Sequence, residues 1–111
     1  MTKLLLFLLL ALPLLAQSAT HTVTLTWTDT SNPAATTYSV YRATGLCSGT
    51  PTFSKLATGV AVKTYVDSTI SPGNYCYQVT ATFAGIESAP SPTALAPVPS
   101  WPPQQLQVAV Q

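Results

Sequence analysis

Charged residues are scarce in this sequence. Of its 111 residues, 6% are charged, with four Lys and Arg against three Asp and Glu. The chain therefore has no basic patch for phosphate contacts and no acidic run, which argues against nucleic acid as a partner. Thr, Ser, Gln and Ala must cover most of the surface, so electrostatic steering of any partner is weak.

Residues that support catalysis or metal binding are equally few. There is one histidine, His21, and the three acids Asp29, Asp67 and Glu87 lie on different predicted elements, with Asp67 ending a strand, so no carboxylate pair is indicated. No Gly-x-Ser-x-Gly elbow and no glycine-rich phosphate loop is present. Two cysteines and one distant histidine do not complete a tetrahedral metal site. We expect a protein that is not an enzyme and that uses no cofactor and no metal.

A sustained helical period is also missing, except in a long apolar run near the N-terminus. Residues 1–19 combine a short positive start, an apolar run over 4–15 and a region of small residues, which is typical of a secretory signal peptide. A membrane-spanning helix needs about 20 apolar residues, and Pro13 lies inside this run. We expect cleavage after Ser18 or Ala19, no membrane span after cleavage, and a secreted or extracytoplasmic protein in the periplasm or at the cell surface. An uncleaved anchor is the alternative.

What the chain does contain is alternation of apolar and polar residues. Over residues 22–28, Val23, Leu25 and Trp27 point one way and threonines the other, which predicts a strand with one buried face. Further strands are predicted at 38–42, 53–56, 63–67, 75–83 and 93–98. Turn signals separate the strands at the spacing of about 8–12 residues that indicates an all-β sandwich or barrel. Four prolines between residues 90 and 99 favour an edge position for the last strand.

The inward positions of these strands form the predicted core. It consists of Trp27, Tyr38, Val40, Tyr65, Ile70, Tyr75, Tyr77 and Val79. Cys76 falls on the opposite face from Tyr75 and Tyr77, because successive side chains of a strand alternate between its faces.

The two cysteines, Cys47 and Cys76, are predicted to form one disulfide in an exported chain. The bond would close a loop of about 30 residues and contribute about 3–4 kcal/mol in the chain-entropy model. Two free thiols are the alternative.

Several ordered segments resemble the fibronectin type III family. They are Val23-x-Leu25-x-Trp27, Tyr38-x-Val40-Tyr41-Arg42, Thr64-Tyr65-Val66-Asp67, Ile70-x-Pro72-Gly73 and Tyr75-x-Tyr77-x-Val79-x-Ala81. The resemblance covers about Thr22 to Val98 and implies an immunoglobulin-like β-sandwich over residues 20–99. It makes Tyr75 the corner tyrosine, whose hydroxyl bonds back to the preceding chain. The disulfide is not part of the family's usual pattern, and the family's usual first strand is absent.

The C-terminal residues 100–111 form a Pro- and Gln-rich tail with a possible extra strand at 104–111. In that segment Leu106, Val108 and Val110 lie on one side of an alternating run and glutamines on the other, as in the missing first strand. Three alternatives stay open. The tail is loose or a relic of a lost repeat, it folds back on its own domain, or it completes the sheet of the next molecule by strand addition.

Two functions are compatible with this sequence. The first is an exported, non-catalytic protein-interaction, adhesion or structural module, whose partner is another protein or its own copies. The alternative is a carbohydrate-associated accessory module of a secreted hydrolase system. The candidate contact residues are Phe83, Ile86, Trp101, Leu106, Val108 and Val110.

Overall fold

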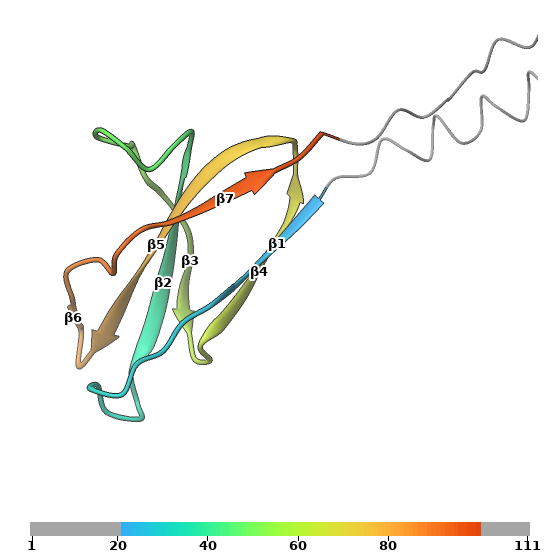
Figure 1. The fold of residues 1–111 in the computed structure, drawn as a ribbon. Helices are drawn as coiled ribbons and strands as arrows, with labels where there is room; N and C mark the ends of the chain where they lie inside the picture. Colours follow the sequence, from blue (N-terminus) through green and yellow to red (C-terminus); the bar gives the residue numbers. More distant parts are fainter. Residues whose placement is uncertain (1–20, 101–111) are drawn as a thin grey trace, which may run out of the picture.

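The structure, a computed structural model, describes residues 21–100, which form seven strands and no helix (Figure 1). The strands are β1 (His21–Thr26), β2 (Thr37–Thr44), β3 (Ser54–Val60), β4 (Thr64–Ile70), β5 (Gly73–Phe83), β6 (Ile86–Glu87) and β7 (Ala94–Val98). The predicted all-β fold is confirmed. The predicted signal peptide and the contact residues of the tail lie outside the described residues.

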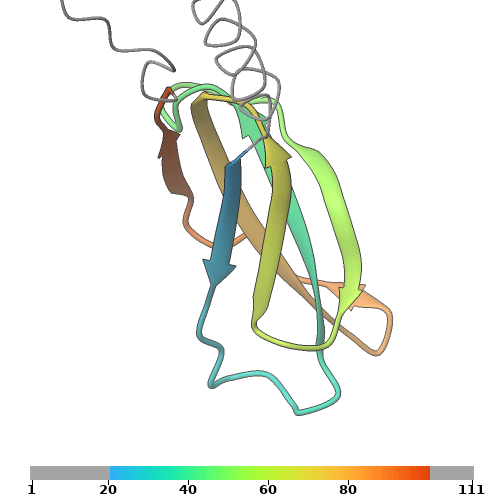
Figure 2. The same cartoon turned by 90° about the vertical axis from the view of Figure 1, so that its right-hand side faces the viewer.

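The strands form two antiparallel sheets that face each other. β1 pairs with β4 in a two-stranded sheet, while β3, β2 and β5 form the larger sheet, with β6 and β7 also pairing to β5. Figure 2 shows β4 between β1 and β3, so that β1 lies at the margin of the sandwich. Within residues 21–100 there is no helix that could cross a membrane.

β5 is the hub of the larger sheet. It pairs with β2 without interruption, from Thr37 opposite Thr82 to Thr44 opposite Tyr75. This register places Tyr38, Val40 and Arg42 of β2 on the same face as Tyr75, Tyr77, Val79 and Ala81 of β5. β6 and β7 share the other edge of β5.

Four strands, β2 to β5, are longer than the alternation predicts, and β3 and β4 extend furthest beyond their predicted ends. β3 continues to Val60 instead of ending at residue 56, and the register between β2 and β3 shifts on either side of Val40. Gly59 adopts a φ of 70° inside β3, a conformation that glycine accepts without strain. β4 runs on to Ile70, so Asp67 lies inside a strand and not at its end. These irregularities break the two-residue period on which the predicted boundaries depend.

Two serines in the segment between β6 and β7 form hydrogen bonds with β5 that a regular strand would otherwise make. Ser88 N and Ser91 N donate to the carbonyls of Ala81 and Val79 at 2.7 and 2.8 Å. In return, Ser88 Oγ accepts from Ala81 N and Ser91 Oγ accepts from Val79 N. These hydroxyls accept hydrogen bonds from N–H groups of β5 at positions where Pro90 and Pro92 prevent a regular neighbouring strand.

The core lies between the two sheets. Tyr38, Val40, Ile70 and Tyr77 are buried, and Trp27, Tyr65, Tyr75 and Val79 are half-buried. The ring of Trp27 packs edge-on against that of Tyr38, with 5.4 Å between centroids. Cys76 is fully buried although it lies on the opposite face of β5, because its disulfide joins it to the loop between β2 and β3.

Candidate interaction surface

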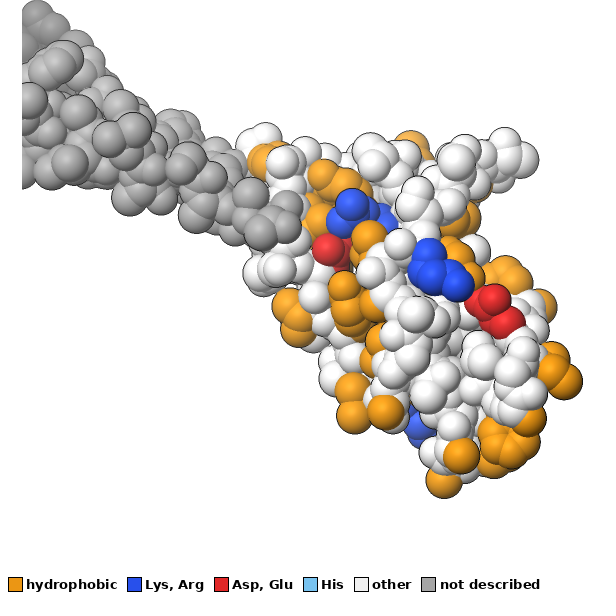
Figure 3. Space-filling view, turned by 180° about the vertical axis from the view of Figure 1, so that it is seen from behind, with side chains coloured by type: hydrophobic (Ala, Val, Ile, Leu, Met, Phe, Trp, Pro, Cys, Tyr) orange, Lys and Arg blue, Asp and Glu red, His pale blue; other side chains and the backbone are white. Residues whose placement is uncertain are grey.

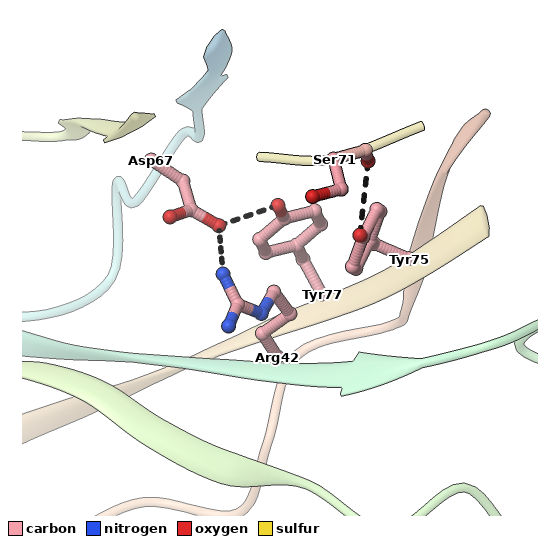
Figure 4. A network of polar contacts seen from close by, with 5 residues as sticks. All are labelled: Arg42, Asp67, Ser71, Tyr75 and Tyr77. Carbon is pink, nitrogen blue, oxygen red and sulfur yellow. Dashed lines mark hydrogen bonds and ion pairs between the residues drawn. The ribbon is translucent and has the colours of Figure 1, made fainter. Parts of the chain in front are cut away.

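A buried ion pair links the two sheets (Figure 4). One carboxylate oxygen of Asp67, on β4, accepts a hydrogen bond from Arg42 Nη1 at 2.8 Å and another from Tyr77 Oη at 2.6 Å. The side chain of Asp67 is 9% exposed and that of Arg42 is 30% exposed. The contact therefore joins β2 and β5 of the larger sheet to β4 of the smaller one.

The electrostatics of this group favour a structural role. Burial, and then the hydrogen bond to Asp67, raise the pKa of the Tyr77 hydroxyl. Burial opposes the charge of Arg42, but the hydrogen bond and the negative charge of Asp67 outweigh it and raise the pKa of Arg42. Both donors keep their protons at neutral pH, so this oxygen of Asp67 keeps both hydrogen bonds.

Tyr75 completes the inner surface beside this pair. Its hydroxyl donates to the carbonyl of Ser71 at 2.9 Å (Figure 4), which is the bond that the family resemblance implies for the corner tyrosine. The guanidinium of Arg42 lies 5.6 Å from the centre of the Tyr75 ring. Tyr75 and Tyr77 are among the predicted core residues, but Arg42 and Asp67 are not. The signal was present, because Arg42 is two residues from Val40 and therefore on the same face.

The predicted disulfide between Cys47 and Cys76 is confirmed. Its sulfur atoms are 2.07 Å apart and its Cα atoms 5.2 Å apart. It connects the loop after β2 to the beginning of β5.

The predicted contact residues Phe83 and Ile86 lie at the β5–β6 hairpin, with exposed fractions of 43% and 74%. The turn between them places Ala84 and Gly85 at positive φ, which suits a two-residue hairpin. Figure 3 shows few charged side chains on the face seen from behind and hydrophobic atoms at the end of the molecule that holds this hairpin. The other predicted contact residues, Trp101, Leu106, Val108 and Val110, lie outside the described residues, and their role in contacts stays a prediction.

A polar cluster holds that hairpin against the outer face of the larger sheet. Glu87 Oε2 accepts hydrogen bonds from Tyr41 Oη and Thr80 Oγ1, and Lys55 Nζ lies 5.6 Å from the centre of the Tyr41 ring. The bonds from Thr80 and Tyr41 lower the pKa of Glu87. Each of these groups contacts another member of the cluster, which indicates that the cluster stabilises the hairpin.

The outer edge of β1 has no strand partner among residues 21–100. Trp27 N donates to Lys63 O, and Leu25 O accepts from Thr64 Oγ1, so the backbone groups of Leu25 and Trp27 face β4. Because backbone groups of an antiparallel strand alternate between its two edges, the N–H and C=O groups of Thr24 and Thr26 face outward. They can pair with an added strand.

Two hollows lie beside this open edge, between the two sheets. The larger has a volume of about 310 Å³, and it is lined on one side by Leu25 to Thr28 and on the other by Tyr77, Gln78, Val79, Ser91, Pro92 and Ala94. The smaller, of about 160 Å³, lies between Trp27 and the Ser88 to Ser91 segment. Trp27 lines both hollows, and its indole Nε1 is buried without a hydrogen-bond partner within the described part of the chain.

Together, the outer edge of β1 and these two hollows form what we call the open margin. It offers backbone donors and acceptors next to apolar side chains. Such an arrangement suits an extended peptide better than a small polar ligand.

Other ligand classes find less support in residues 21–100. No group of three or more His, Cys, Asp and Glu side chains there could hold a metal ion. Phe83, 43% exposed, is the one exposed aromatic side chain among residues 21–100, so these residues offer no row of rings for stacking on a sugar. The carbohydrate alternative therefore has no specific observation behind it.

Comparisons with solved structures agree with the β-sandwich fold of residues 21–100. No protein-family model matches the sequence, and no characterised protein matches it significantly in sequence. A crystal structure of a Fn3-like protein from Clostridium thermocellum is similar, with 29% identity over 73% of this chain and 80% of that chain and a TM-score of 0.58. The solution structure of a human fourth FNIII domain is similar with 19% identity, over 75% of this chain and 70% of that chain, with a TM-score of 0.60.

Proposed function

Because residues 21–100 form a domain of the fibronectin type III type, we propose that the chain is an exported, non-catalytic interaction module that binds an extended segment of a protein along the open margin. The observation that carries the proposal is the outer edge of β1 beside the two hollows. In strand addition, main-chain hydrogen bonds supply affinity, and pockets for alternate side chains supply specificity.

The edge of β1 lacks the usual protection against strand pairing. Edge strands are commonly blunted by charged side chains, especially Lys, or by Pro. Two of the other edge strands follow that rule, with Lys55 on β3 and Pro97 on β7. The sequence of β1, His-Thr-Val-Thr-Leu-Thr, has no Lys, Arg, Asp, Glu or Pro. An edge left open in this way supports a role in binding.

Support for export comes from the disulfide and from the leader-like sequence of residues 1–19. Expression of the full chain in a secretion-competent bacterium tests this part. We expect oxidised protein outside the cytoplasm, with the mass of a chain that begins at Ala19 or Thr20. A full-length, reduced chain that stays in the cytoplasm would contradict it.

Position-specific photo-crosslinking in the producing cells tests the binding role. A benzophenone side chain at position 24 reports on the open margin. The matched control is position 58, another exposed threonine, on the edge strand β3 of the other sheet. We expect a protein adduct from position 24 and not from position 58. Equal labelling from both positions, or none, would refute a binding role for the open margin.

A further inference from the structure

The chain itself carries a segment that matches the open margin. Residues 104–111, Gln-Gln-Leu-Gln-Val-Ala-Val-Gln, place Leu106, Val108 and Val110 on one side of an extended segment. The segment contains no Lys, Arg, Asp or Glu, and neither does β1. Pairing the two would therefore bury no charged side chain. Eight residues extend over about 27 Å and cover the roughly 20 Å length of a six-residue strand.

The positions of the strand ends decide which molecule can receive this segment. His21 at the start of β1 pairs with Ile70, and Val98 at the end of β7 pairs with Gly73, just beyond the following turn. Figure 1 shows the start of β1 and the end of β7 at the same end of the sandwich. A segment that turns back from there onto its own β1 runs in the same direction as β1, which gives parallel pairing.

Antiparallel pairing is the more stable arrangement per residue. It requires the segment to enter at the other end of β1, near Trp27. The five residues 99–103 between the end of β7 and this segment span about 17 Å at most, which is less than the length of a six-residue strand. They cannot carry the segment to the far end of its own domain. They can carry it into a second domain stacked on the end where β7 finishes.

We infer that residues 104–111 of one copy pair antiparallel with β1 of the next copy, with Leu106, Val108 and Val110 directed towards the hollows. This inference rests on the proposed function, since it names the partner of the open margin as a second copy of this chain. The contact joins two different surfaces and leaves a free tail and a free edge at the two ends of each assembly. Copies therefore add head to tail into open filaments.

Two substitutions in the tail test the donor side. Val108→Asp puts a charge on the apolar side of the segment, while Gln107→Asp puts the same charge on its polar side. For the processed wild-type protein, we expect a molar mass by light scattering that rises with concentration. Val108→Asp should weaken association at least about tenfold, corresponding to about 1.4 kcal/mol, and Gln107→Asp should preserve it. A wild-type protein that stays monomeric at high concentration would overturn the inference.

One substitution on β1 tests the acceptor side. Thr24→Pro removes an N–H that faces outward and leaves the contacts with β4 in place, and Thr24→Val keeps that N–H as the control. Thr24→Pro still has a donor tail, and Val108→Asp still has an open edge. Each should be monomeric alone, and the two mixed should form a one-to-one dimer that grows no further. The mixture gives this result even if Thr24→Pro folds poorly, because its tail is the part that binds. No dimer in the mixture would count against the inference.

The crosslinking experiment separates this inference from the proposed function. An adduct between position 24 and residues 104–111 of another copy supports both. An adduct with a different protein, together with a monomeric purified chain, leaves the proposed function standing and overturns the inference. A monomer in which position 24 labels nothing refutes both.

Discussion

Asp67 is a charged residue at a position that the two-residue period assigns to the core. Its carboxylate accepts hydrogen bonds from Arg42 and Tyr77 across the space between the sheets. A buried ion pair contributes little compared with well-packed apolar side chains, but removing one partner leaves the other charge without compensation. The pair therefore constrains how the sheets face each other more than it adds stability.

This asymmetry gives a prediction for single and double substitutions. Asp67→Ala should lower the free energy of unfolding by about 2–4 kcal/mol, below the upper end of the usual range because Arg42 is partly exposed. Adding Arg42→Met to it should restore part of the loss, since no uncompensated charge remains. Urea unfolding of the four proteins in a double-mutant cycle measures the coupling. Strictly additive losses would show that the two residues act independently.

The interior residues that the sequence predicts and those that it does not predict differ in kind. Alternation placed Tyr38, Val40 and Tyr77 correctly on one face, because apolar and aromatic residues agree with their burial there. Arg42 follows the same period but was not assigned to the interior, because charged residues are almost never buried unless paired. Its partner Asp67 is 25 positions away and on the other sheet, and no local pattern reveals such a contact.

At the scale of elements, the loop between β1 and β2 is organised by Asp29. Its carboxylate accepts hydrogen bonds from the backbone of Ser31 and Asn32, from the Asn32 amide, and from the hydroxyl of Tyr38. The hydrogen bonds from the Asn32 and Tyr38 side chains, in that order, lower the pKa of Asp29 to about 2 from its usual 3.8. The loop therefore depends on an ionised Asp29.

The pH dependence follows from the sign of this change. A carboxyl whose pKa is lower in the folded state contributes its stabilisation above pH 3.8 and loses it as the pH falls towards about 2. The wild-type unfolding midpoint should fall over that range more steeply than that of Asp29→Asn. Glu87→Gln is the comparison, because the pKa of Glu87 is also lowered in the folded state. Protonation of Glu87 should therefore still destabilise Asp29→Asn as the pH falls. Identical pH profiles for wild type and Asp29→Asn would contradict the role of Asp29.

The elements themselves were largely predictable, and the open margin only in part. The family resemblance implies a first strand that the sequence does not show, and the structure adds that the outer edge of β1 has no strand partner among residues 21–100. The hollows beside it depend on how Ser88 and Ser91 attach an irregular, proline-containing segment to β5. Serine hydroxyls that replace backbone acceptors leave no periodic signal in the sequence. The side of the sandwich that stays open therefore emerges only from the folded arrangement.

At the scale of the whole molecule, a small domain with a two-stranded second sheet has limited core to hold it together. Domains of this size bury a smaller fraction of their surface than larger ones. The Cys47–Cys76 bond, with a sequence separation of 29, ties the loop after β2 to the hub strand β5. In the chain-entropy model, a loop of this length contributes about 3–4 kcal/mol by restricting the unfolded chain. That is a large share of the roughly 5–15 kcal/mol typical of a native domain.

Removing the bond should therefore affect the entire fold at once. The double variant Cys47→Ala and Cys76→Ala should unfold at a lower urea concentration, with a loss of about 2–4 kcal/mol. Its denaturant slope should be steeper, because the unfolded chain without the cross-link exposes more surface. Reduction of the wild-type protein during the same titration is the control, since it breaks the bond without altering the sequence. An unchanged midpoint in both experiments would show that the packing between the sheets is sufficient without the disulfide.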